Sequence, residues 1–220
     1  MEDALWIDGE GRLRRGAGLV LDPWRWCWQP AGAAVAPAGA RVTPRAAIAH
    51  LGRGGAMRHL PVGVIGPRNA TPEQAATAEA LGAALGGLGL VVVCGGRGGV
   101  MAAVARGARA AGGLTVGILP GPDWREANPD IALPIATGLG EARNAVIARA
   151  AVALISVGHS LGTLTEVGFG LHFGRPVIGL CDTRPLEGLV MAGSVDAAVD
   201  LLCGALLDLA GCHKTDSDTG

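Results

Sequence analysis

The sequence predicts an α/β fold of three layers, in which helices cover both faces of a mostly parallel sheet, together with an N-terminal extension. Between residues 60 and 212, short apolar segments alternate with alanine-rich segments of about ten to fifteen residues, as in strand–helix–strand units. The apolar segments are nearly continuous, which is typical of strands that are buried on both faces. Glycine accounts for 37 of the 220 residues, which suits a sheet with many tight turns.

Strands and helices follow one another at regular intervals from residue 61 onward. Thr71, Pro72 and Gln74 mark the start of one helix, because they match an N-cap, a proline in the first turn and a capping-box glutamine. The alternation implies right-handed crossovers and therefore a Rossmann-like parallel sheet. The predicted strands are 61–66, 90–94, 115–119, 131–136, 152–157 and 176–180, and the predicted helices are 75–88, 100–111, 141–150, 163–173 and 194–209.

The chain divides into three parts by composition. Within the first part, Trp24, Trp26 and Trp28 alternate with other residues, so a strand there would place all three indoles on one face. Packing on the main domain or on a partner subunit is favoured over ligand stacking for these side chains. The three parts are an N-terminal extension of short strands and loop (1–57), a Rossmann-like ligand-binding domain (58–212) and a disordered polar tail (213–220).

The composition excludes several classes of protein. The net charge is −1, from 18 basic and 19 acidic residues, so neither nucleic acid nor a membrane surface is expected as a partner. No apolar run approaches the roughly 18 to 20 residues that span a bilayer, and the chain does not begin with a signal-peptide pattern, so a cytoplasmic location is expected. The five cysteines show no C-x-x-C spacing, which argues for reduced thiols and against a metal site.

Two further cofactor classes are excluded by single residues. The only lysine is Lys214, in the tail, so the chain has neither the lysine of a Walker A loop nor a core lysine for pyridoxal phosphate (PLP). The glycines of segment 95–99 do not match the dinucleotide fingerprint, and the next strand ends at Leu119 and Pro120 without the acidic residue that binds ribose. NAD is therefore not expected either.

Four strand-to-helix turns are rich in glycine. In a parallel sheet such turns lie at the carboxyl ends of the strands, where ligands bind near the point at which the strand order reverses. Glycine lets backbone N–H groups approach a phosphate, and the following helix adds a favourable dipole. A single turn of this kind can be steric in origin, but four in the same topological position predict an anion site. The candidate binding residues are Gly66, Arg68, Asn69, Gly95, Gly96, Arg97, Gly98, Gly99, Val100, Met101, Gly140, Arg143, Asn144, Gly158, His159, Ser160, Leu161, Gly162, Thr163 and Glu166.

Thr163 and Glu166 have two interpretations. Thr-x-x-Glu at a helix start is a capping box, in which Thr163 caps the helix and Glu166 reaches back to the backbone. Alternatively, Glu166 lines the ligand pocket and exchanges a hydrogen bond or a proton with the ligand. The local pattern favours capping, although the two roles are compatible.

The cations available for phosphate are Arg68, Arg97 and Arg143, because a guanidinium group can grip phosphate through two parallel hydrogen bonds. His159 is interpreted as a solvated loop side chain in preference to a ligand contact. The segment 121–125 is long enough to form a lid, with Trp124 as a stacking surface.

Several segments together resemble one superfamily. They are CGGRGGVM at 94–101, GLGEARN at 138–144, and GTLTE at 162–166 followed by GRPVI at 174–178. This combination, within residues 61–182, is similar to the Lonely Guy-like superfamily, whose members are often labelled lysine decarboxylases. The GLGEARN segment looks most like the branch of molybdenum cofactor carrier proteins. The lysine decarboxylase label does not fit a chain without a core lysine.

The resemblance implies two different activities. Carrier-type members bind the molybdenum cofactor (molybdopterin) without turning it over, and their expected partners are molybdoenzymes or cofactor-insertion proteins. Lonely Guy-type members are phosphoribohydrolases, N-glycosyl hydrolases that release base and ribose 5-phosphate from nucleoside 5′-monophosphates such as AMP. In such a hydrolase, Arg143 and Glu166 are the implied catalytic residues. A nucleotide-sensing module is a third alternative, and the resemblance implies a homodimer or higher homo-oligomer.

The hydrolase signature P-G-G-x-G-T-x-x-E is only partly present. Gly162, Thr163 and Glu166 match it, whereas residues 158–160 read Gly-His-Ser in place of Pro-Gly-Gly. Residues 143–144 read Arg-Asn where the hydrolases have Arg-Lys. The predicted function is therefore that of a phosphate-binding carrier of the molybdenum cofactor, with the nucleoside monophosphate phosphoribohydrolase as the alternative.

Overall fold

The computed structural model describes residues 4–32, 39–55 and 57–211. The disordered tail expected at residues 213–220 lies outside the described residues. None of the helices in the described part is long and apolar enough to cross a membrane. Contacts between residues divide the chain into two compact units, a larger one of residues 59–202 and a smaller one of residues 1–58 with 203–220.

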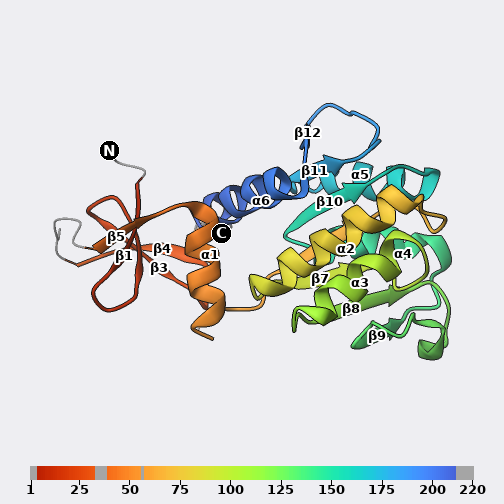
Figure 1. Ribbon diagram of the computed structural model, residues 1–220, viewed down its shortest axis with the longest axis horizontal. Coiled ribbons are helices and arrows are strands. Elements are labelled where there is room, and N and C mark those ends of the chain that lie inside the picture. The colour runs from red at the N-terminus through yellow and green to blue at the C-terminus, as the bar shows by residue number, and fades with distance from the viewer. Residues whose placement is uncertain (1–3, 33–38, 56, 212–220) are drawn as a thin grey trace, which may run out of the picture. The chain divides into compact units, whose positions relative to one another are not determined.

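The larger unit has the α/β fold that the sequence predicts. Its sheet has the strand order β12-β11-β10-β6-β7-β8-β9, and every neighbouring pair is parallel. Helices flank this sheet (Figure 1), so the predicted Rossmann-like three-layer arrangement is confirmed. The strands are β6 (Pro61–Ile65), β7 (Val91–Cys94), β8 (Thr115–Leu119), β9 (Leu133–Ala136), β10 (Ala153–Val157), β11 (Val177–Leu180) and β12 (Leu189–Met191).

The helices of this unit pack in pairs. Helices α2 and α3 lie against each other on one face of the sheet, and α4 and α5 lie against each other on the opposite face, as right-handed crossovers require. Glycine permits the first of these contacts, because a Cβ on Gly82 would overlap the carbonyl oxygen of Val104. The helices are α2 (Pro72–Gly87), α3 (Val100–Ala110), α4 (Arg143–Ala150) and α5 (Leu161–His172), together with the first half of α6 (Val195–Leu209), whose residues from 203 onward belong to the smaller unit.

The start of α2 follows its local sequence. The Thr71 hydroxyl accepts a hydrogen bond from Gln74 N–H at 3.2 Å, and Thr71 N–H donates to Gln74 Oε1 at 3.0 Å, so the predicted capping box is confirmed. Strand β12 was not predicted, because its apolar run is only three residues long.

The strand order reverses between β6 and β10. From β6 the chain proceeds through β7, β8 and β9 on one side, then returns to β10 and continues to β11 and β12 on the other. The carboxyl ends of β6 and β10 therefore border the crevice in which open parallel sheets bind ligands. Both strands are buried, with Val64 and Ile155 wholly shielded from solvent, so the turns at this edge stand on a rigid base.

The smaller unit contains an antiparallel sheet in the order β4-β3-β2-β1-β5, so the short strands expected in the extension are present. It also contains a helix that the sequence did not predict, because its Thr43 cap and Pro44 stand at the end of a Pro/Ala/Gly-rich run. The elements are β1 (Leu5–Asp8), β2 (Leu13–Arg15), β3 (Leu19–Asp22), β4 (Cys27–Pro30), β5 (Gly39–Val42) and α1 (Pro44–Arg53).

The three alternating tryptophans do not share one face, so that expectation is wrong. Strand β4 begins only at Cys27, and the turn before it leaves Trp24 60% exposed while Trp26 is 8% exposed. The indole N–H groups of Trp26 and Trp28 donate to the carbonyls of residues 206 and 207, at 2.7 and 3.0 Å. These two side chains thus pack on the last turns of α6, within the smaller unit.

Candidate functional site

A cavity of about 130 Å³, here called the first cavity, opens at the carboxyl edge of the parallel sheet. Its walls come from the turns after β6, β7 and β8, from Met101 at the start of α3, from the residues around the start of α4, and from Ser160 and the first two turns of α5. These turns meet at one edge because all the strands run in the same direction. The lining residues are Gly66, Arg68, Arg97, Met101, Pro120, Glu141, Arg143, Asn144, Ser160, Gly162, Thr163 and Glu166.

Arg143, Asn144 and Glu166 form a buried polar group in this cavity. Arg143 Nη1 donates to Asn144 Oδ1 and to Glu166 Oε1, the latter at 3.3 Å. Asn144 Nδ2 donates to the hydroxyl of Thr165 at 2.9 Å and to the carbonyl of Gly162 at 3.4 Å. Asn144 therefore ties the start of α4 to the first turn of α5 and holds the Arg143 guanidinium group in place. Among the described residues, Arg143 Nε is buried without a hydrogen-bond partner.

Glu166 does not form the capping box that the local pattern favours. Helix α5 begins at Leu161, and its N-cap is Ser160, whose hydroxyl accepts a hydrogen bond from Thr163 N–H at 3.1 Å. The capping interpretation of Thr163 is therefore wrong, because Ser160 already occupies the cap position. The Glu166 carboxyl group instead contacts Arg143 and lines the first cavity.

The environment of Glu166 changes its protonation. Only 6% of the residue is exposed, and burial raises the pKa of its carboxyl group from 4.5 to about 8. Arg143 opposes this shift and Glu141 adds to it. The 3.3 Å separation from Arg143 would suit an ion pair, but the loss of hydration outweighs that attraction. Glu166 is then mostly protonated at neutral pH, and the positive charge of Arg143 stays uncompensated by it.

The two other arginines of the first cavity differ in their partners. Arg97 Nη1 pairs with Glu126 Oε2 at 2.5 Å, and the Asn128 side chain donates to the Arg97 carbonyl at 2.9 Å. Arg68 is exposed and makes no ion pair with the described residues. The segment proposed as a lid carries Trp124, which is 59% exposed and is not among the lining residues of the first cavity.

Glycines in the turns bring parts of the protein close together. Gly99 has a φ of +65°, and a Cβ there would overlap the carbonyl oxygens of Pro67 and Arg68 in the neighbouring turn. A Cβ on Gly95 would stand 2.8 Å from Arg143 Nη2 and 2.7 Å from the sulfur of Met101. The glycine-rich segment therefore makes room for the adjacent turn and for the Arg143 guanidinium group.

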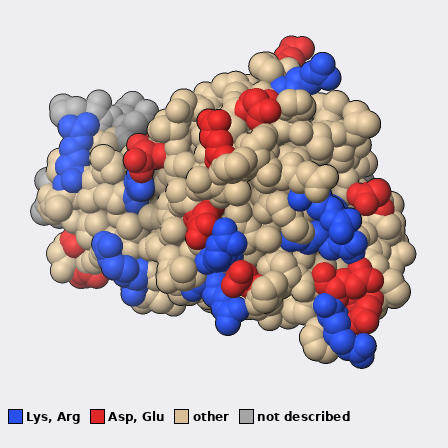
Figure 2. Space-filling model, turned by 45° about the vertical axis from the view of Figure 1, so that its right-hand side comes forward, with Lys and Arg blue, Asp and Glu red and all other residues tan. Residues whose placement is uncertain are grey.

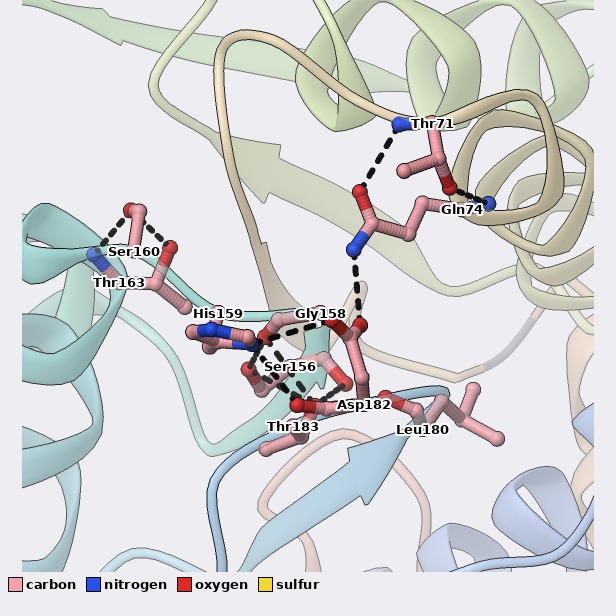
Figure 3. A network of polar contacts seen from close by, with 10 residues as sticks. All are labelled: Thr71, Gln74, Ser156, Gly158, His159, Ser160, Thr163, Leu180, Asp182 and Thr183. Atoms are coloured by element: carbon pink, nitrogen blue, oxygen red, sulfur yellow. Dashed lines mark hydrogen bonds and ion pairs between the residues drawn. The ribbon is translucent and has the colours of Figure 1, made fainter.

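A second cavity, of about 160 Å³, shares Ser160 and Thr163 with the first. Gly158, His159 and Leu161, all predicted site residues, line this cavity and not the first. Figure 3 shows the polar network beside it, in which His159, from the loop after β10, contacts Asp182, from the loop after β11. The remaining lining residues are Ser156, Leu164, Val167, Thr183 and Arg184.

Some predicted residues line neither of these two cavities, and some lining residues were not predicted. In the first cavity, Pro120 and Glu141 are the lining residues that were not predicted. Pro120 directly follows the predicted strand 115–119 and Glu141 lies two residues before Arg143, so their positions at a strand end and at a helix start were the available signals. The predicted residues that line neither cavity are Asn69, Gly95, Gly96, Gly98, Gly99, Val100 and Gly140.

The charged side chains are mixed in sign. On the face drawn in Figure 2, Lys and Arg side chains lie next to Asp and Glu side chains, without a broad surface of one sign. The net charge of −1 agrees with this distribution. An anion would therefore be attracted locally, by arginines at the first cavity, and not by the field of the whole protein.

Comparisons with known proteins agree with this fold. The SLOG cluster4 family matches residues 59–199. An uncharacterised protein from Archaeoglobus fulgidus is 37% identical over 145 residues, which are 66% of this chain and 95% of that protein. The structure of the molybdenum cofactor binding protein from Rippkaea orientalis is 34% identical with a TM-score of 0.64, and the match covers 67% of this chain and 98% of that one.

The structure of the molybdenum cofactor carrier protein from Chlamydomonas reinhardtii is also 34% identical, with a TM-score of 0.63, and the match covers 68% of this chain and 99% of that one. The family match contains every segment on which the resemblance in the sequence rests. The resemblance to the Lonely Guy-like superfamily is thereby confirmed, and the chain belongs to the SLOG cluster4 family.

Proposed function

We propose that this protein binds the molybdenum cofactor through its phosphate group and acts as a carrier or store of that cofactor. The observation that carries the proposal is the meeting of Arg68, Arg97 and Arg143 at one cavity, on turns from three different parts of the chain. The similarity to a molybdenum cofactor binding protein and to a carrier protein supports the choice of ligand.

The residues of the first cavity fit a phosphate monoester. Arg143 Nε is buried without a partner among the described residues, and the exposed Arg68 makes no ion pair there. The hydroxyl groups of Ser160 and Thr163 lie 2.7 Å apart in the wall, and either can donate a hydrogen bond to a phosphate oxygen. When bound, the cofactor itself supplies redox chemistry at its metal. This chain supplies the cations and hydroxyl groups that would hold the phosphate.

Arg68→Ala tests this arrangement without disturbing a buried residue. A charge-assisted hydrogen bond contributes about 1.5 to 3 kcal/mol, so we expect Arg68→Ala to weaken binding of purified molybdenum cofactor by about tenfold or more under anaerobic conditions. Arg53→Ala is the matched control, because Arg53 is exposed, lies in α1 and is outside the lining of the first cavity. No binding by the natural protein, or equal loss in the two variants, would contradict the proposal.

A phosphoribohydrolase is the second candidate, and the raised pKa of Glu166 favours it. A carboxylic acid that keeps its proton to about pH 8 can donate that proton to a departing base, and Arg143 lies beside it to bind phosphate. In this alternative, the protein releases adenine and ribose 5-phosphate from AMP, and Glu166→Gln abolishes the release.

Chromatography of AMP incubated with the protein separates these functions. The carrier proposal expects no ribose 5-phosphate from the natural protein, whereas sustained release that is lost in Glu166→Gln would replace it with the hydrolase. A nucleotide-sensing module would bind AMP, detected as a rise in the melting temperature, without releasing adenine.

We also propose that the protein forms a homo-oligomer. Apolar side chains are exposed along α4 and α5, with Leu161 at 85%, Val146 at 37% and Phe169 at 37%. Leu161→Glu should therefore lower the mass measured by sedimentation velocity, because it places a charge in this face. Leu114→Glu is the control, at a residue that is 42% exposed and lies outside α4 and α5. A monomeric natural protein would contradict this proposal.

A further inference from the structure

The second cavity combines an apolar wall with one oriented imidazole. Leu161, Leu164 and Val167 supply the apolar wall from successive turns of α5. The polar side chains of Ser156 and Thr183 are occupied, because both hydroxyl groups lie within hydrogen-bond distance of the Gly158 carbonyl, at 3.1 and 3.2 Å. His159 is 60% exposed in its side chain and stands at the rim.

The contacts of His159 determine which ring nitrogen carries the proton. Nδ1 lies 2.9 Å from the carbonyl oxygen of Asp182 and 3.1 Å from its carboxylate Oδ2. Both of these atoms are acceptors, so Nδ1 is the nitrogen that donates. In the neutral imidazole, Nε2 then carries a free lone pair. Figure 3 shows this second nitrogen on the side of the ring that is turned away from Asp182.

Gln74 fixes Asp182 from the far side of the network. Its Nε2 donates to Asp182 Oδ1 at 2.8 Å, and this hydrogen bond holds the pKa of Asp182 below its usual range. The approach requires glycine at 158, because any Cβ there would overlap Gln74 Nε2. The capping-box glutamine of α2 is therefore also a positioning residue for His159, acting through Asp182.

The two cavities adjoin each other, so one ligand can occupy both. Pockets for complete ligands measure about 300 to 1,000 Å³, and neither the first cavity nor the second reaches that range alone. They share the wall formed by Ser160 and Thr163, so a molecule can place a charged group in the first and a ring in the second.

We infer that the second cavity binds the amino-substituted nitrogen heterocycle of the phosphate ligand, with His159 Nε2 accepting a hydrogen bond from a ring or amino N–H. The apolar side chains of α5 cover the ring, and the oriented imidazole selects rings that carry a donor at that position. This inference rests on the proposed function for the presence of a phosphate ligand. Pterins and purines share the required chemistry, and separate probes distinguish them.

The experiment uses probes that each report one cavity. Neopterin and adenosine carry the two heterocycles without phosphate, and inorganic phosphate carries the anion alone. Titrations of the full chain, followed by pterin fluorescence or by calorimetry, should show neopterin or adenosine binding that His159→Phe weakens by about tenfold, with phosphate binding unchanged. His172→Phe is the matched control, on an exposed histidine that lines neither cavity.

Gln74→Glu tests the positioning role, because glutamate keeps the acceptor that Thr71 N–H uses in the capping box but repels Asp182. It should weaken binding of the heterocycle and leave the phosphate titration unchanged. The inference is overturned if neither heterocycle binds at millimolar concentration, or if His159→Phe binds the heterocycle as well as the natural protein. If neopterin or adenosine binds but inorganic phosphate does not, the phosphate anchoring of the proposed function is overturned instead.

Discussion

Replacing Glu166 with glutamine should stabilise the protein at pH 8 and have little effect on its stability near pH 5. Glutamine has nearly the same shape as the protonated side chain, and its Oε1 can accept the hydrogen bond that Arg143 Nη1 donates at 3.3 Å. The substitution therefore removes the titration of residue 166 while keeping its packing and its contact with Arg143.

The direction of this change in stability follows from the number of protons that the folded and the unfolded state bind. Folded Glu166 keeps its proton to about pH 8, whereas the unfolded chain loses it near pH 4.5. Between these values the folded state binds one more proton, so the free energy of unfolding falls as the pH rises. The free energy of unfolding changes by about 1.4 kcal/mol per pH unit in this range. The titration of Glu166 therefore lowers the free energy of unfolding of the natural protein by about 3 kcal/mol at pH 7, and the decrease approaches a limit of about 5 kcal/mol above pH 8.

Urea unfolding followed by far-ultraviolet circular dichroism at pH 5, 6, 7 and 8 measures this difference. The natural protein should become steadily less stable than Glu166→Gln as the pH rises. Glu187→Gln, at an exposed carboxylate, should follow the natural protein at every pH. The reasoning fails if the difference in unfolding free energy between Glu166→Gln and the natural protein is the same at every pH, or if the variant is the less stable of the two at pH 8. The latter result would mean that Glu166 is ionised and paired with Arg143.

Two other substitutions test the packing. Trp26→Phe removes the indole that donates to the carbonyl of Leu206, and should lower the unfolding free energy by about 1 to 3 kcal/mol, whereas Trp24→Phe, at an exposed indole, should change it by less than about 0.5 kcal/mol. Gly99→Ala should cost about 2 kcal/mol or more, because φ is +65° and the new Cβ meets backbone oxygens, while Gly98→Ala, with no neighbouring atom closer than 3.7 Å, should be nearly neutral. Equal midpoints in urea for either pair would contradict the corresponding contact.

The parts of the fold that sequence reasoning predicted are those set by neighbouring residues. The start of α2 needs only Thr71, Pro72 and Gln74, and the apolar run of β7 followed by glycines needs no distant partner. The expected strand through Trp24, Trp26 and Trp28 does not form, for a local reason that the alternation of residues does not reveal. The Asp22 carboxylate accepts hydrogen bonds from the N–H groups of residues 24 and 25, at 2.9 and 2.8 Å, and so ends the strand in a turn.

The site residues likewise divide into those whose position follows from the topology and those that depend on contacts between distant residues. Alternation of strands and helices was enough to predict that Arg68, Arg97 and Arg143 approach one edge of the sheet, because topology alone brings the strand ends there. The orientation of Glu166 toward Arg143 depends on a contact between two helices, and the same Thr-x-x-Glu letters suit a cap equally well. The link from Gln74 to Asp182 joins residues 108 positions apart, and a single sequence carries no signal for it.

The smaller unit draws on both ends of the chain, and this affects how the protein is made. A ribosome adds about 5 to 20 residues per second, so residues 1–58 are synthesised roughly 7 to 30 seconds before residues 203–211. During that interval the indoles of Trp26 and Trp28 have no helix carbonyls to bind. The nascent N-terminal sheet therefore lacks its packing against α6 until that helix is synthesised, and a chain that stops before α6 leaves this sheet without its helical support.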